Sequence, residues 1–232
     1  MLKPLTREKT EQLIPLIATG KQYAYYWGKW SDVLNRVLVS FVGVVVILIL
    51  DVLFGDQGEA LILLLGGIVS LYWLWCPVYQ ASLRNSASRR FKYSGFWRGK
   101  VLDVYLTEEL IGEEETVNQR GELVIVENRE RWINLVLGDR TGFEVEVQAP
   151  LQRIYKGIKP GQIAELLVLS NKLDLSQINK ISDAYLPQKD IWVGQYPYLQ
   201  RDVFMEVSRQ LGGRPATRVR RRSNSRIKKR DW

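Results

Sequence analysis

Two long apolar runs near the N-terminus dominate the hydropathy pattern of this chain. The first covers residues 37–54 and the second covers residues 60–81, with only Gly55–Glu59 between them. A helix needs about 20 apolar residues to cross the hydrocarbon core of a bilayer. The pattern therefore predicts a transmembrane α-hairpin of two helices within residues 36–82.

From residue 92 to residue 170 the apolar positions recur at every second residue, which is typical of strands with one buried face. The predicted strands cover residues 100–106, 122–127, 132–137, 143–148 and 163–169. The segments GDRTG (138–142) and KPGQ (159–162) are turn signals, and the acidic segment 107–121 is expected to be a solvated loop. Together they predict a small antiparallel β domain of OB or SH3-like barrel size.

Residues 171–213 are predicted to complete this domain with helices. A short helix is expected over residues 173–186, and an amphipathic helix over residues 198–211 ends at two glycines. The segment between the helices is rich in aromatic residues. Trp192 and Tyr196 are expected to anchor the last helix; alternatively, Trp192, Tyr196 and Tyr198 form an exposed edge that binds a partner.

The formal net charge of +8 belongs to the C-terminal tail. Nine Lys or Arg residues fall between residues 214 and 230, and residues 1–213 carry no net charge. Residues 214–232 are predicted to be a disordered tail that lies on anionic lipid of the cytoplasmic leaflet or on an acidic partner. Nucleic acid is a less favoured partner, because only Trp232 offers a ring for base stacking. The basic residues singled out are Arg218, Arg220, Arg221, Arg222, Lys228, Lys229 and Arg230.

The distribution of charge also predicts a topology. Residues 84–100 carry six basic residues and no acid, whereas the loop between the apolar runs has Asp56 and Glu59 and no base. Basic segments stay in the cytoplasm, so both termini are expected there. Residues 1–35 form an N-terminal segment that is expected to lie at the membrane interface, where Tyr and Trp are enriched.

Small residues in the second run provide a candidate packing surface. Gly66 and Ser70 are four residues apart, and Gly67 widens the groove between them. Such spacing lets helix backbones approach closely. These residues are expected to pack against the first helix of the hairpin or to dock on a helix of a partner.

The composition argues against an enzyme. The chain has no histidine and one cysteine, Cys76. This excludes Ser-His-Asp and Cys-His catalysis, zinc sites built on histidine and a disulfide within the chain. We predict no catalytic, metal or cofactor-binding residue.

Two long segments carry a resemblance to a family. LTREKTEQLIPLIATGKQYAYYWGKWSDVLNRVLVS near the N-terminus and ISDAYLPQKDIWVGQYPYLQRDVFMEVSRQLGG near the C-terminus resemble cyanobacterial two-span membrane proteins of uncharacterised function, some labelled phosphate transporter permease. The resemblance implies the thylakoid or plasma membrane and transfers no catalytic residue. The overall plan is similar to that of the photosystem I assembly factor Ycf4.

These observations favour a non-enzymatic integral membrane protein that assists assembly or stability of a thylakoid (photosynthetic) membrane complex. One alternative is an accessory or regulatory subunit of a membrane transporter. Another is a membrane-tethered RNA-binding protein. A permease by itself would need more helices than two to enclose a solute pathway.

Overall fold

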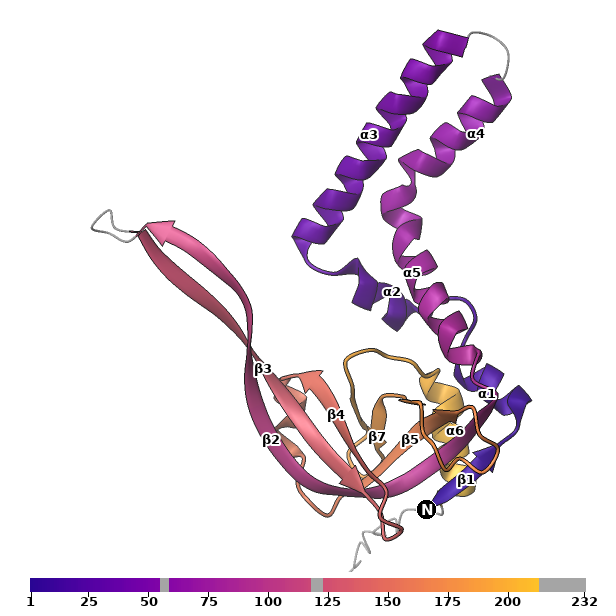
Figure 1. Cartoon of the computed structure of the whole chain (residues 1–232), viewed down its shortest axis with the longest axis vertical. Helices are drawn as coiled ribbons and strands as arrows, with labels where there is room; N and C mark the ends of the chain where they lie inside the picture. Colours follow the sequence, from indigo (N-terminus) through magenta and orange to yellow (C-terminus); the bar gives the residue numbers. More distant parts are fainter. Residues whose placement is uncertain (55–58, 118–122, 213–232) are drawn as a thin grey trace, which may run out of the picture.

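The computed structural model describes residues 1–54, 59–117 and 123–212, and it places a slender helical part above a curled β-sheet (Figure 1). The helices of the described part are α1 (Arg7–Leu13), α2 (Gly20–Trp27), α3 (Trp30–Phe54), α4 (Glu59–Ser70), α5 (Tyr72–Arg89), the 3₁₀ helix η1 (Arg153–Gly157) and α6 (Arg201–Leu211). The strands are β1 (Leu2–Leu5), β2 (Tyr93–Val117), β3 (Leu123–Gly138), β4 (Glu144–Pro150), β5 (Ile163–Ser170), β6 (Lys180–Ile181), β7 (Ala184–Leu186) and β8 (Ile191–Val193).

The two apolar runs fold differently from each other. Helix α3 is a single helix of 25 residues, and it is long and apolar enough to cross a membrane. The second run is split into α4 and α5, which are bent by 72° at a break beside Leu71. The prediction of a hairpin of two transmembrane helices is therefore wrong, since only one helix in the described part is by itself long and apolar enough to span.

The break between α4 and α5 lies beside Leu71, at the N-terminal end of α5. Pro77 lies six residues farther on, and because it has no N–H it removes the helical hydrogen bond to the carbonyl of Trp73 in the first turns of α5. Side chains satisfy the backbone groups that the break releases. The N–H of Trp73 donates to Oγ of Ser40 on α3 at 3.2 Å, and Nε1 of Trp75 donates to the carbonyl of Ile68 at 2.9 Å. The bend is thus held by specific hydrogen bonds.

The strands of the described chain form one antiparallel sheet, in the order β4-β3-β2-β5-β7-β8, with β1 paired to β2 and β6 paired to β5. Strand β2 is shared by two parts of this sheet. Residues from Tyr93 to Lys100 pair with β5, and residues from Lys100 to Val117 pair with β3. The predicted five-stranded small barrel is wrong, because the structure has eight strands and no pairing between β4 and β8 in its described part.

Both faces of the curled sheet are covered at its centre, so two cores result. The concave face packs Trp97, Leu135 and Leu166 together. The convex face packs Phe96 and Leu167 against Phe204 of α6, with Leu13 of α1 alongside. Alternate residues of β5 enter the two cores, which explains why nearly every side chain of this strand is buried.

Several sequence assignments need correction. The predicted strands 122–127 and 132–137 are parts of the single strand β3. The expected helix 173–186 instead contains the strands β6 and β7, so the C-terminal helices reduce to α6. The turn between β3 and β4 and the turn before β5 lie where GDRTG and KPGQ predicted them, and Gly142 and Gly161 both adopt φ of +86°.

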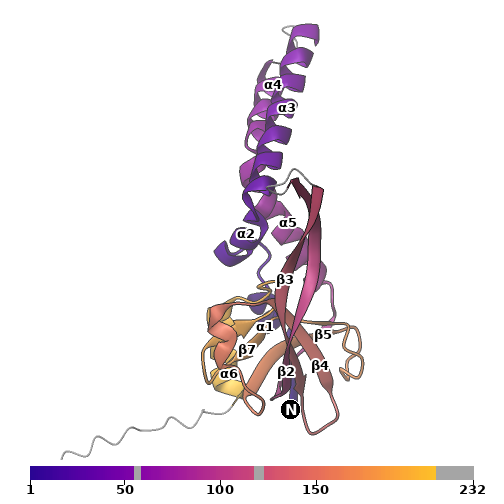
Figure 2. The same ribbon diagram turned by 90° about the vertical axis from the view of Figure 1, so that its left-hand side faces the viewer.

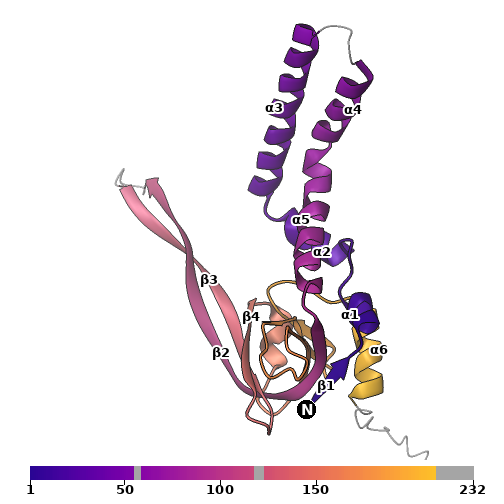
Figure 3. The same cartoon turned by 45° about the vertical axis from the view of Figure 1, so that its right-hand side comes forward.

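The expected acidic loop 107–121 is also wrong over its described part, because β2 continues to Val117 and pairs with β3. These outer halves of β2 and β3, residues 107–117 and 123–131, form a two-stranded ribbon that we call the arm. The arm leaves the sheet on the side where the helices stand, and its outer end lies level with the lower end of α3 (Figures 1, 2 and 3). Glu108 and Arg131 pair across it at 2.9 Å.

Candidate functional site

Two buried amides connect the helical part to the β part. Gln22 of α2 and Asn85 of α5 are fully buried. Asn85 Nδ2 donates to Gln22 Oε1 at 2.8 Å, and Gln22 Nε2 donates to Asn85 Oδ1 at 3.0 Å and to the carbonyl of Pro197 at 2.9 Å. The N–H of Thr19 also donates to Gln22 Oε1. We call the contacts of Gln22, Asn85 and Pro197 the amide joint; they fix α2 and α5 to the chain that leads into α6.

Tyrosines and cations surround the amide joint. The guanidinium of Arg84 lies 4.2 Å from the ring centre of Tyr196, and its Nε donates to the hydroxyl of Tyr198 at 3.0 Å. Nζ of Lys180 lies 4.3 Å from the ring centre of Tyr198. Cation–π contacts of this kind gain strength as water is excluded. The aromatic segment therefore attaches the base of α5 to the sheet.

The alternative of an exposed aromatic edge is not what the structure shows. Trp192 is 8% exposed and Tyr196 is 1% exposed, and Tyr198 is half-buried. The ring of Trp192 packs against Phe204 with 5.4 Å between ring centres, which is a contact with α6. A role of these three residues in binding a partner stays a prediction.

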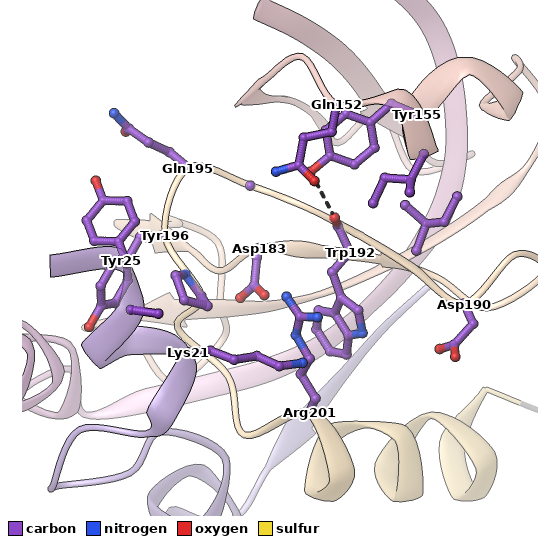
Figure 4. Close-up of a pocket in the computed structure, with 15 residues that line it drawn as sticks. Lys21, Tyr25, Gln152, Tyr155, Asp183, Asp190, Trp192, Gln195, Tyr196 and Arg201 are labelled. Carbon is purple, nitrogen blue, oxygen red and sulfur yellow. Dashed lines mark hydrogen bonds between the residues drawn. The ribbon is translucent and has the colours of Figure 1, made fainter. Parts of the chain in front are cut away.

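A cavity of about 470 Å³ lies below α2, between η1, β8 and the start of α6 (Figure 4). Its walls include the aromatic residues Tyr155, Trp192 and Tyr196, and the hydroxyl of Tyr155 donates to the carbonyl of Trp192 at 3.2 Å. Lys21 and Arg201 contribute positive charge to the lining, and Asp183 and Asp190 contribute carboxyl groups. Small-molecule sites commonly have volumes of about 300–1,000 Å³, so the cavity has the size of a ligand site.

Asp183 is the buried carboxyl of this cavity. It is 4% exposed, and its Oδ1 accepts the N–H of Tyr198 at 3.2 Å, whereas its Oδ2 has no partner among the described residues. Burial raises the pKa of Asp183 to about 7, against the opposing effects of backbone hydrogen bonds and of the nearby charge of Arg201. Asp183 therefore changes its charge near neutral pH.

A glycine makes the position of Asp183 possible. A Cβ added to Gly194 would lie 2.9 Å from the Cα of Asp183 and 2.7 Å from its Cβ. No larger residue fits without moving the backbone. The short segment from Gly194 to Tyr196 also borders a second cavity of about 240 Å³, whose lining includes Asp183 and Arg84.

Lys21 and Arg201 face this carboxyl from α2 and α6 (Figure 4). Burial is the main cause that lowers the pKa of Lys21, and repulsion from Arg201 lowers it further. The guanidinium of Arg201 lies 5.1 Å from the ring centre of Trp192, while its buried Nε has no hydrogen-bond partner in the described structure. Neither cation forms an ion pair with a described carboxylate, so both are available to a ligand.

The chemistry of this site suits binding. Tyr155, a possible nucleophile or acid, donates its hydroxyl to a backbone carbonyl, and burial raises its pKa. An activated nucleophile needs a base within hydrogen-bonding reach. Among the described lining residues, no hydroxyl is bonded to Asp183.

The predicted helix-packing residues differ in their surroundings. A Cβ on Gly66 would lie 3.9 Å from Ile47 of α3, so Gly66 faces that helix. A Cβ on Gly67 would meet nothing within 4 Å, and the hydroxyl of Ser70 donates to the carbonyl of Gly67. The closest approach is at Gly43 of α3, where an added Cβ would lie 2.4 Å from Cγ1 of Val69.

The basic tail residues named from the sequence lie outside the described residues, as does the linker 55–58. The sequence analysis did not identify Gln22, Asn85, Asp183 or Arg201. A partial signal existed only for Asp183 and Arg201, since they flank the aromatic segment 191–198 within 18 residues of each other in the chain.

Comparisons with known proteins give a family and no function. A family model described as "Family of unknown function (DUF8619)" matches residues 3–221. No curated protein and no solved structure matches the chain. Since the match covers almost the whole sequence, this chain belongs to the DUF8619 family of unknown function.

Proposed function

We propose that this protein is a non-enzymatic, membrane-anchored protein that assists assembly or stability of a membrane complex, with the thylakoid membrane as the setting that the sequence resemblance suggests. The observation that carries the proposal is an apolar helix, exposed along its length, that is fixed to a folded body by the amide joint. The arm supplies the surface for the partner.

The exposure of α3 supports the anchor. Only 11% of the residues in the most apolar stretch of α3 are buried. Phe41 and Val52 are 65% and 84% exposed. The core helix of a soluble protein would be covered by its own chain. Removal of α3 as a cleaved signal would also remove β1 and Gln22, which are parts of the folded body.

The basic residues around the anchor support a cytoplasmic position for the sheet. Lys21, Lys29 and Arg36 precede or begin the apolar part of α3. Arg89 is the last residue of α5 and Arg90 follows it. Membrane proteins retain such residues on the cytoplasmic side. The arm then stands beside the cytoplasmic surface of the membrane.

The charge of the arm supports a protein partner over a lipid surface. Residues 107–117 and 123–131 contain seven acidic and two basic residues. An anionic leaflet repels such a segment, whereas the cytoplasmic loops of integral membrane proteins are rich in Lys and Arg. We therefore take the partner to be a basic cytoplasmic loop of an integral membrane protein.

One cross-strand pair supports a binding role for the arm. Glu109 and Glu130 lie directly opposite each other in the register of β2 and β3, and both are exposed. Like charges at opposite positions destabilise a ribbon. A like-charged pair that destabilises the ribbon is expected at a surface whose charge binds a partner.

The test is purification of the full chain from membranes in mild detergent, followed by mass spectrometry of the co-purifying subunits. The double variant Glu109→Gln with Glu130→Gln should lower partner recovery about tenfold, since rim charges of this kind contribute up to about 1 kcal/mol each. Its thermal stability should not fall, because the variant removes a repulsion.

The matched control is Glu8→Gln with Glu144→Gln, which removes two exposed acids away from the arm and should leave recovery unchanged. Recovery of the wild-type chain with no integral membrane subunit would contradict the proposal. Recovery with a multi-span permease and no pigment protein would identify the complex as a transporter.

A further inference from the structure

The cavity below α2 gathers buried polar atoms that lack partners. Oδ2 of Asp183 and Nε of Arg201 are buried and unbonded in the described structure, and both residues line the same space. Figure 4 shows the carboxylate of Asp183 directed toward the side where the ends of Lys21 and Arg201 meet. Buried polar groups are nearly always hydrogen-bonded, so these atoms indicate a polar ligand.

The charges of the lining indicate what the ligand carries. Lys21 and Arg201 approach closely enough for Arg201 to lower the pKa of Lys21. Two converging cations without an acidic partner suit a group with more than one negative charge. Guanidinium and ammonium groups are common phosphate binders.

The carboxyl at the floor adds a second requirement. Oδ2 of Asp183 has no hydrogen-bond partner among the described residues, so this oxygen is free to accept a hydrogen bond from a ligand. A bare phosphate would be repelled by this carboxylate. A ligand that presents a hydroxyl or amino group to Asp183 would satisfy it.

We propose that this cavity binds a small phosphate ester with a hydroxyl or amino group close to the phosphate. Arg201 and Lys21 hold the phosphate, Asp183 accepts the hydrogen bond of the neighbouring donor, and Tyr155 and Trp192 form the wall. This inference is independent of the proposed membrane partner. It assigns to the protein a binding site for a small molecule.

The phosphate ester has two possible sources. It can be a soluble molecule, or it can be the headgroup of a phospholipid, because α2 leads directly into α3 through the turn at Gly28. Both sources present anionic phosphate oxygens and a neighbouring hydroxyl to the same residues, with up to two negative charges on the soluble monoester and one on the lipid phosphodiester. The experiment therefore includes one arm for each source.

The soluble arm uses the full chain in detergent and measures heat of binding on titration with sn-glycerol 3-phosphate. We expect saturable binding at least about tenfold tighter than that of inorganic phosphate, which lacks the donor for Asp183, and of glycerol, which lacks the phosphate. The lipid arm uses nanodiscs of phosphatidylglycerol or of phosphatidylcholine. Loss of glycerol 3-phosphate binding in phosphatidylglycerol alone identifies the headgroup as the ligand, and equal binding in both identifies a soluble ligand.

Variants locate the site. Arg201→Gln and Asp183→Asn should each weaken glycerol 3-phosphate binding about tenfold or more, because each removes a charged hydrogen-bond partner. Arg209→Gln changes an exposed base on the same helix and should leave binding unchanged. Lys21→Gln changes an exposed residue at the cavity, so its weaker binding would not reflect misfolding.

Two results would overturn the inference. One is no detectable binding of glycerol 3-phosphate in detergent or in phosphatidylcholine, up to about 10 mM, together with no preference for phosphatidylglycerol. The other is binding that survives Arg201→Gln and Lys21→Gln at wild-type affinity. The second result would place the bound phosphate elsewhere on the chain.

Discussion

The amide joint and the cavity are two buried polar clusters that share one stretch of chain and differ in one respect. In the joint, Gln22 and Asn85 satisfy each other, and Pro197 completes the set. In the cavity, Asp183 and Arg201 keep unbonded atoms. Satisfied polar groups favour a single well-defined packing, whereas unsatisfied buried groups cost stability. This difference is the reason for proposing a structural role for the joint and a binding role for the cavity.

The largest expected effect on stability comes from removing the charge of Asp183, the unsatisfied carboxyl of the cavity. Burial raises the pKa of Asp183 to about 7 from its ordinary value of 3.8. The folded state therefore holds a proton that the unfolded state releases, and stability falls as the pH rises from about 4 to about 7. Asp183→Asn should remove this fall and stabilise the protein above pH 7 by up to about 4 kcal/mol, at about 1.4 kcal/mol per pKa unit.

Thermal unfolding of the detergent-solubilised chain at pH 5 and pH 8 checks this expectation. The wild type should lose stability between pH 5 and pH 8. The Asp183→Asn variant should lose less over the same interval. A variant that is destabilised equally at both values would show that Asp183 is a structural residue. The gain in stability should accompany the loss of ligand binding described above.

Breaking the satisfied cluster should have the opposite sign. Asn85→Leu leaves the amide of Gln22 without one donor and one acceptor in a fully buried place. We expect a loss of about 2 kcal/mol in the free energy of unfolding, since two buried hydrogen bonds are lost and each contributes about 1 kcal/mol. The double variant Gln22→Leu with Asn85→Leu should lose less than the sum of the single losses.

Urea unfolding with a double-mutant cycle measures this coupling. Additive losses would mean that the two amides do not act as a pair. Limited proteolysis between α5 and β2 offers a second observation, because a loosened joint should expose the connection at residues 90–92 to cleavage.

The smallest expected effect on stability comes from removing one hydrogen bond beside the break between α4 and α5. Ser40→Ala removes the acceptor of the Trp73 N–H, and we expect a loss of about 1 kcal/mol. Ser82→Ala is the control, because the Ser82 hydroxyl donates to Val78 in its own helix turn. Equal effects of the two changes on thermal unfolding in detergent would deny Ser40 a special role at the bend.

Sequence patterns predicted β4, which buries one face, and β5, which buries both, and they failed for most of the arm, whose described side chains are mostly exposed. They located β4 and the turn at Gly142, where apolar and polar residues alternate. They predicted a strand over 122–127 but missed the rest of the arm, because an exposed ribbon needs no apolar alternation and the acidic composition of residues 107–121 suggested a loop. Pro77 was a visible sign against a straight second helix.

The cavity could not have been predicted by such patterns. Lys21 and Asp183 are 162 positions apart in the chain, and they share a space only because α2 packs over the sheet. An amide pair such as Gln22 and Asn85 has no periodic signature either. The aromatic residues around 191–198 were a correct sign of dense packing near the site, but they did not reveal its polar centre.

Strand β2 has a mechanical consequence. Only three residues separate it from the end of α5, and it crosses the whole sheet and continues to the end of its part of the arm. A pull or push on the arm is therefore transmitted along a single backbone to the foot of the membrane-proximal helix. A displacement of the arm and a displacement of the lower end of α5 are therefore connected through one continuous strand in the sheet.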